Sequence, residues 1–424
     1  MTEAVFSTWG ALAGLAVAIV LIVRRATPAY ALVLGALAGG LLGGGGLDAT
    51  VKAMIAGTQA MMPSVLRILV SGVLVGALVK TGSAAKIADA VVAGCGSRFA
   101  LAAVALATMI VTAVGVFVDI AVITVAPVAL AIGRRADVPV PALLLAMIGG
   151  GKAGNVISPN PNTIAVAEAF KVDLTTLMLA NAVPAACALV VTVLLAAWLA
   201  RRRPGFVPPF ADAAAPAGLP SLAQAVAGPA VVVALLALRP LCGVDVDPLV
   251  ALPAGGIVSI LACGRWRSTV AYSEFGLSKV VGVSVLLVGT GTIAGIIKAS
   301  GLNGDMVAML HACHLPVAAI APVSGLLFSG ATASTTAGVT IASQTFFGAL
   351  AASGVPAISA AAMLHAGGTV FDALPHGSFF HATAGAVGMG VRERLRLFPY
   401  GEIVGATTTI VSVLVHMVWR LPTF

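Results

Sequence analysis

Long apolar runs separated by short polar breaks make up almost the whole chain. Twelve runs cover residues 4–23, 29–47, 62–80, 100–133, 141–170, 174–200, 223–240, 248–264, 278–298, 316–350, 356–390 and 400–419. A helix needs roughly 20 apolar residues to cross the hydrocarbon core of a bilayer. The pattern therefore predicts an all-α polytopic membrane protein that is embedded in a lipid bilayer.

Runs 100–133 and 316–350 are each too long for one span and too short for two. Their middles are rich in Gly, Ser and Thr or carry a charge. We expect re-entrant helical hairpins, whose non-helical tips are tolerated at membrane depth only where protein or a cavity covers them. Runs 141–170 and 356–390 contain Gly and Pro in their middles. Because these residues interrupt helices, the two runs predict broken transmembrane helices.

The positions of Lys and Arg decide the orientation of the spans. If both hairpins return to the side that they left, 16 of the 23 basic residues fall on one side. That set comprises Arg24, Arg25, Lys80, Lys86, Arg98, Arg134, Arg135, Arg201, Arg202, Arg203, Arg265, Arg267, Lys279, Arg392, Arg394 and Arg396. Cytoplasmic loops carry the excess of basic residues. We therefore predict that both termini lie outside the cytoplasm.

The first apolar run is predicted to be a retained span. Glu3 precedes it without any basic residue, and Arg24 and Arg25 follow it. A signal peptide carries its positive charge first and a small-residue cleavage site afterwards.

The two halves of the chain share an order of landmarks, which indicates an internal repeat. Pro159 in the first broken run corresponds to Pro375 in the second, 216 residues later. Since each half has an odd number of crossings, the second copy is inverted, as in secondary transporters that bind substrate between the repeats. The predicted division is a first inverted repeat at 1–200, a cytoplasmic linker at 201–222 and a second inverted repeat at 223–424.

The composition excludes most soluble classes of protein. Hydrophobic residues make up 60% of the chain and charged residues only 9%, against roughly 25% charged residues in soluble domains. The net charge of +8 does not indicate nucleic-acid binding, because the basic residues stand at the ends of apolar runs. The five cysteines are scattered without a CxxC pair, so we expect neither disulfides nor a metal site. No cofactor is expected.

Four segments are expected to converge on a binding site: 112–120, 149–163, 329–338 and 366–378. Gly and Pro unwind helices there and expose half-helix N-termini, which attract anions. Asn, Ser and Thr supply neutral hydrogen bonds, so the site suits a carboxylate with hydroxyl neighbours. The predicted substrate-binding residues are Lys152, Asn155, Ser158, Asn160, Asn162, Thr163, Thr332, Ser334, Thr335, Thr336, His376 and Ser378.

Asp119 is the only acid in run 100–133. A charge at the centre of a membrane helix costs about 2.5–3.5 kcal/mol on insertion scales. We therefore predict that Asp119 couples transport to an ion, with an ion pair to Lys152 as the alternative. Lys152 is the one cation in a helix break. It binds a substrate carboxylate or neutralises Asp119 or Asp372, and the sequence leaves both roles open.

Asp372 and His376 lie one turn apart if helical, and are predicted as further ion-coupling residues in a proton relay. The alternative is a helix cap by Asp372 and a backbone hydrogen bond by His376. Glu168, near the end of its half-helix, is predicted to be solvated. His311 and His314 have a metal-like spacing, but no third ligand lies nearby, so we assign them to an interfacial segment.

These segments resemble the gluconate permease family of the ion transporter superfamily. The resemblance is carried by GVFVDIAVITVAPVALAIGRR (115–135), GGGKAGNVISPNPNTIAVAEA (149–169), SGATASTTAG (329–338) and AGGTVFDALPHGSFF (366–380). It implies an elevator-type fold, a homodimer and proton-driven symport of a sugar acid such as gluconate or a hydroxycarboxylate such as 3-hydroxybutyrate. The order of hairpin and break is also similar to that of sodium symporters for di- and tricarboxylates.

Those sodium symporters carry Ser-Asn-Thr at each hairpin tip, whereas the tips here are Val118-Asp119-Ile120 and Ala333-Ser334-Thr335. The departure weakens the case for sodium coupling. A sodium-coupled carboxylate transporter or an ion antiporter of the same fold is the alternative function. A membrane-embedded serine hydrolase using Ser329 or Ser334 would need a partner base that the sequence does not offer, so we predict that the protein is not an enzyme.

Overall fold

The computed structural model describes residues 5–24, 26–95, 99–202, 218–244, 246–302, 305, 308, 317–352, 354–375 and 377–418. Within these residues the secondary structure is helical, and the one bridge of extended backbone joins Phe6 to Ser300. The predicted linker 201–222 and the His311–His314 pair fall largely outside the described residues.

Ten helices form the first half of the described chain. They are α1 (Thr8–Val23), α2 (Pro28–Leu42), α3 (Gly46–Lys80), α4 (Ser83–Cys95), α5 (Ala100–Ala113), α6 (Val118–Ala136), α7 (Val140–Asn155), α8 (Pro161–Phe170), α9 (Leu174–Ala180) and α10 (Ala182–Arg202).

The second half repeats this order. Its described helices are α11 (Leu222–Cys242), α12 (Pro248–Ala262), η2 (Trp266–Ser268), α13 (Thr269–Lys298), η3 (Val317–Ala319), α15 (Ile320–Thr332), α16 (Thr335–Ala352), α17 (Ala357–Gly367), α18 (Ser378–Ala386), α19 (Val391–Val413) and the π turn η4 (Leu414–Val418).

Both predicted hairpins and both predicted broken helices are present. In the first hairpin, α5 and α6 pack together around a tip at 114–117, and Gly115 adopts a φ of 108°. In the second, α15 and α16 pack together, and Ala333 turns the chain in the left-handed region. The breaks lie between α7 and α8 and between α17 and α18. The predicted interruption by Gly and Pro is therefore confirmed.

The packing of the helices follows the repeat. The pair α1 and α2 corresponds to α11 and α12, and α3 packs on α12 as α13 packs on α2. The counterparts α3 and α13 also pack on each other, antiparallel, since Gly57 meets Gly291 and Gly72 meets Gly276. Counterpart helices that run in opposite directions are what an inverted repeat requires. The all-α fold with two inverted repeats is confirmed.

Four described helical segments are long and apolar enough to cross a membrane: Gly46–Lys80, Ala182–Arg202, Trp266–Lys298 and Val391–Val418. Helix α3 has 35 residues and is about 52 Å long at 1.5 Å per residue. The predicted runs 62–80, 278–298 and 400–419 were therefore too short. Hydropathy identifies the part of a helix that contacts lipid. These helices extend beyond that part into stretches that carry charged residues.

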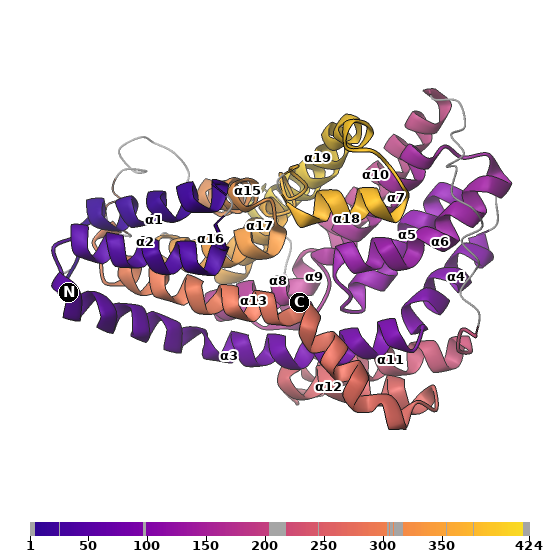
Figure 1. Ribbon diagram of the computed structural model, residues 1–424, viewed down its shortest axis with the longest axis horizontal. Coiled ribbons are helices and arrows are strands. Elements are labelled where there is room, and N and C mark those ends of the chain that lie inside the picture. The colour runs from indigo at the N-terminus through magenta and orange to yellow at the C-terminus, as the bar shows by residue number, and fades with distance from the viewer. Residues whose placement is uncertain are drawn as a thin grey trace.

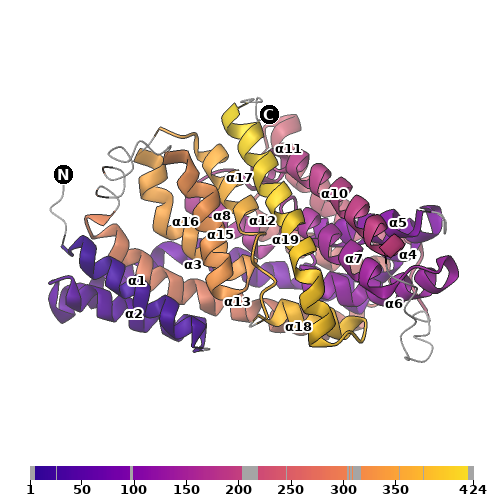
Figure 2. The ribbon, with the colours of Figure 1, turned by 90° about the horizontal axis from the view of Figure 1, so that it is seen from above.

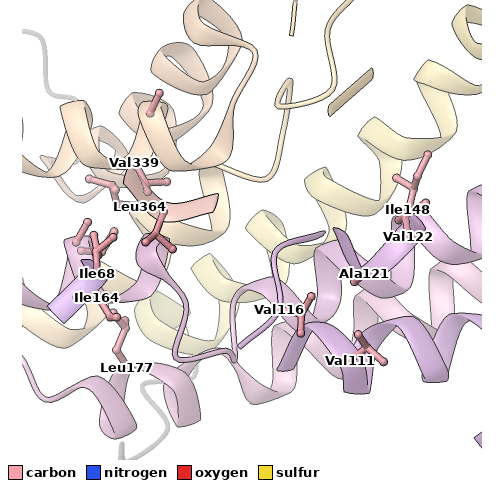
Figure 3. Packing of buried hydrophobic residues seen from close by; sticks show 14 of the residues in the cluster. Ile68, Val111, Val116, Ala121, Val122, Ile148, Ile164, Leu177, Val339 and Leu364 are labelled. Carbon is pink, nitrogen blue, oxygen red and sulfur yellow. The ribbon is translucent and has the colours of Figure 1, made fainter. Parts of the chain in front are cut away.

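The long helices α3 and α13 run side by side along the molecule, with α1 and α2 at one end and α5 and α6 at the other (Figure 1). Helix α19 lies between α10 and α17 (Figure 2). The half-helices α7, α8 and α17 lie in the interior, and nearly every residue of α7 is buried. Figure 3 shows side chains of one buried cluster, which extends from Val111, Val122 and Ile148 to Ile164 and Leu364.

Candidate functional site

A cavity of about 360 Å³ lies where the two hairpin tips and the two helix breaks meet. Its apolar walls come mainly from the first tip, from α13 and from Phe379. Its polar lining residues are Asp119, Asn155, Asn162, Lys279, Ser334, Thr335, Thr336, Asp372 and Ser378. The predicted convergence of the four segments is therefore present in the structure.

The second hairpin tip is tied to both breaks. The Thr335 hydroxyl donates to Asp372 Oδ2 at 2.8 Å. The neighbouring Thr336 hydroxyl donates to Asn162 Oδ1. Both threonines stand in the first turn of α16, so its N-terminus faces the cavity. Helix α18 also begins at the cavity with Ser378, and its N-cap Gly377 offers no side-chain cap.

Side-chain amides hold the first break in shape. The Asn160 amide donates to Asn155 Oδ1 at 2.7 Å, and Asn162 donates to the same oxygen at 2.9 Å. Asn160 also caps α8, because its Oδ1 accepts from the backbone N–H groups of Asn162 and Thr163. Ser158 donates to the carbonyl of Thr112 at 2.7 Å, which ties the break to the first hairpin.

Lys152 is buried behind the cavity in an ion-pair cluster. Its ammonium lies 2.8 Å from Asp372 Oδ1 and 3.6 Å from Glu402 Oε1, and it donates to the carbonyls of Thr369 and Gly401. The Lys152 side chain is 1% exposed and that of Asp372 is 6% exposed. Lys152 thus neutralises Asp372 rather than Asp119, and Asp372 is the member of the cluster that reaches the cavity.

Asp119 lies in the first turn of α6 and lines the cavity. Its Oδ1 accepts a hydrogen bond from the backbone N–H of Ile120 at 2.9 Å. The described residues contain no ion pair between Asp119 and Lys152, which was the alternative reading of the sequence. Asp119 is therefore a carboxylate at a helix N-terminus, where the helix dipole favours negative charge.

The structure divides the predicted site residues into two groups. Asp119, Asn155, Asn162, Ser334, Thr335, Thr336, Asp372 and Ser378 line the cavity. Lys152, Ser158, Asn160, Thr163 and Thr332 do not, and their side chains hold the breaks and the second tip. His376 lies outside the described residues.

Sequence reasoning missed three charged residues of this region. Lys279 was counted only among the basic residues on the cytoplasmic side, whereas it lies within α13 and lines the cavity. Glu402 is the only acid in run 400–419, a signal that resembles that of Asp119. Arg394 was also counted only among those basic residues, yet it lies in α19, is 1% exposed and donates to Thr383.

A second polar cavity, of about 210 Å³, lies around Arg67 of α3. Arg67 pairs with Glu168 at the end of α8 and with Asp247, the N-cap of α12. The hydrogen bond from Arg67 holds the pKa of the Asp247 carboxyl below its usual range. Glu168, which was predicted to be solvated, is 31% exposed and also pairs with the guanidinium of Arg67 from another helix. Two acids already pair with this arginine, and the other cation that lines the cavity is Lys171.

Comparison with known proteins gives the chain its family. Residues 8–249 match the family model described as GntP family permease. An uncharacterized transporter of Haemophilus influenzae is 49% identical over 414 residues, which cover 98% of this chain and 99% of that protein. An uncharacterized permease of the same organism is 28% identical over 200 residues, covering 46% of this chain and 41% of that protein.

The fold is similar to that of the Alcanivorax borkumensis YdaH transporter, whose crystal structure was described as revealing an unusual topology. The TM-score is 0.69 at 16% sequence identity, over 90% of this chain and 91% of that one. The likeness concerns the arrangement of helices. Together with the matched residues, it leads to one conclusion: the chain belongs to the GntP permease family and is a multi-pass membrane transporter.

Proposed function

We propose that the protein is a proton-coupled symporter of a small organic anion, such as gluconate, another sugar acid or 3-hydroxybutyrate. The observation that carries the proposal is the cavity enclosed by both hairpin tips and both breaks. Its hydroxyls, amides and helix N-termini suit a carboxylate with hydroxyl groups. Its cation, Lys279, suits the negative charge.

We further propose that the protein works in the inner membrane as a homodimer, with both termini in the periplasm. In this proposal residues 1–200 and 223–424 are the inverted repeats and 201–222 is a cytoplasmic linker. The hairpins and broken helices would move together against α3 and α13 in an elevator-like step. The support is that the hairpins and breaks supply most of the polar lining of the cavity, while α3 and α13, which supplies Lys279, pack tightly on each other.

The first test is transport by the purified protein in liposomes, recorded as transient charge movement on a solid-supported membrane. The panel contains gluconate, other sugar acids, 3-hydroxybutyrate, lactate, citrate and succinate, with and without sodium, at two pH values. We expect a current with one hydroxy acid that persists without sodium and grows at acid pH. Radiolabelled uptake detects the same substrate if the cycle moves no net charge.

A current that needs sodium would support the alternative, a sodium-coupled di- or tricarboxylate transporter. Exchange of inorganic ions would support an antiporter.

Replacing Asp119 by Asn should abolish proton-driven accumulation of the anion. The amide keeps the size of the side chain and cannot carry a proton between the two sides of the membrane. Exchange of labelled for unlabelled anion should continue, because exchange needs no net proton movement. Accumulation and exchange are measured in the same liposomes. Normal accumulation by Asp119→Asn would make Asp119 a structural residue.

A further inference from the structure

The cavity contains one cation that sequence reasoning placed elsewhere. Lys279 lies in α13, ten residues after its first residue, Thr269. Its ammonium sits 4.9 Å from the centre of the Phe275 ring, one turn earlier on the same helix. Lys80, at the end of α3, lies 4.3 Å from the centre of the same ring, but it does not line the cavity. The two lysines share one aromatic neighbour, and only Lys279 faces the site.

The charges around the cavity leave Lys279 as the cation that an anion can reach. Lys152 is enclosed by Asp372, Glu402 and two backbone carbonyls, and it is not among the lining residues. Lys279 forms no ion pair within the described part of the chain. Asp119 lines the same cavity.

Other charged groups near Asp119 already have partners. Asp372, from the second break, is held by Lys152 and Thr335. His381 of α18 is hydrogen-bonded to the carbonyl of Pro375 at 2.8 Å. On α4, which also packs on α6, Lys86 and Asp89 pair with each other at 3.1 Å. Among the described residues that line the cavity, Asp119 and Lys279 are therefore the charged groups that form no ion pair.

We propose that Lys279 binds the carboxylate of the transported anion and that Asp119 is its counter-ion when the cavity is empty. The proposal rests on the proposed function and deepens it. With Asp119 ionised, the negative charge balances Lys279. When Asp119 takes up a proton from water, Lys279 needs another anion, and the substrate carboxylate supplies it. The charges of Asp119, Lys279 and the bound anion sum to zero in both states.

This charge balance explains why anion and proton bind together. An anion that enters without a proton leaves one excess negative charge, and a proton that binds alone leaves one excess positive charge. Both states leave a charge in the cavity without its counter-charge, which costs Coulomb energy. One free cation also selects the substrate class: a single carboxylate, with hydroxyls for Asn155, Asn162 and the tip threonines, in preference to a di- or tricarboxylate.

The test is equilibrium exchange in liposomes with gluconate or 3-hydroxybutyrate, whichever the wild-type protein transports. Lys279→Gln should raise the apparent KM by about tenfold or more, since a hydrogen bond to a charged group is lost. Lys279→Arg should stay within about threefold of wild type, because it keeps the charge. Lys80→Gln is the matched control and should leave the KM unchanged.

Each result decides the proposal. If the wild type is active and Lys279→Gln has the same KM, the role of Lys279 is overturned and the proposed function stands. If wild type transports no organic anion, the proposed function fails and takes this inference with it. If Lys279→Gln does not fold, competition on wild type decides. If succinate inhibits transport as strongly as the unlabelled monocarboxylate does, the proposal of a single carboxylate-binding cation is contradicted. If succinate inhibits at least about tenfold more weakly, the proposal is supported.

Discussion

Replacing Lys152 by Met should lower the stability of the protein by about 3–5 kcal/mol, because removing one partner of a buried ion pair leaves an uncompensated charge. Here two carboxylates, Asp372 and Glu402, would lose the same ammonium. Thermal unfolding in detergent, followed by light scattering, measures the effect. Transport should be lost as well, because an unpaired Asp372 would repel an anion in the cavity.

A matched control separates burial from charge. Lys52 and Asp48 of α3 also form an ion pair, at 2.7 Å, but their side chains are 75% and 81% exposed. Lys52→Met should therefore change stability by no more than about 1 kcal/mol. Adding Asp372→Asn and Glu402→Gln to Lys152→Met should recover part of the loss, because the buried charges are then removed. A Lys152→Met protein as stable as wild type would show that the cluster is already neutral without its lysine.

Replacing Gly276 by Ala should also destabilise the fold strongly, by about 3 kcal/mol, since overpacking of this kind costs 1–3 kcal/mol or more. A Cβ at Gly276 would overlap the backbone carbonyl of Gly72 on the facing helix, and a backbone cannot escape by changing rotamer. The two helices would have to separate along their length. The measurement is again thermal unfolding in detergent.

The control for this variant lies on the same helix. Gly282 is exposed on α13, and a Cβ there would have no neighbour within 4 Å. Ala favours a helix over Gly by about 1 kcal/mol, so Gly282→Ala should leave stability unchanged or raise it. If Gly276→Ala lowers stability and Gly282→Ala does not, the effect comes from the packing of α3 on α13. Equal effects would contradict the close packing of α3 on α13.

The hairpins and breaks could be predicted from the sequence because each has a local cause. Gly115 supplies a positive φ at the first tip, and Pro161 begins the half-helix after the first break. The amide residues Asn155 and Asn162 were placed in the site by the same reasoning, and they line the cavity.

The charged contacts could not be predicted, because they join helices far apart in the sequence. Lys152 and Glu402 lie 250 positions apart, and nothing local links them. Lys279 was counted among the cytoplasmic basic residues at the start of run 278–298, although the helix begins earlier, at Thr269. When the first turns of a long helix contain polar residues, their sequence looks like that of a loop.

Helices α3 and α13 each pack on helices of the other repeat, which affects how the protein folds during its synthesis. Helix α3 packs on α12 and α13, which are synthesised much later, and α13 packs back on α2 and α3. The first half of the chain thus enters the membrane with the glycine face of α3 uncovered. It reaches its final packing only after α13 has left the ribosome. During that interval the face of α3 that carries Gly57, Gly72 and Gly76 is open to chaperones, to proteases and to other nascent copies of the same chain.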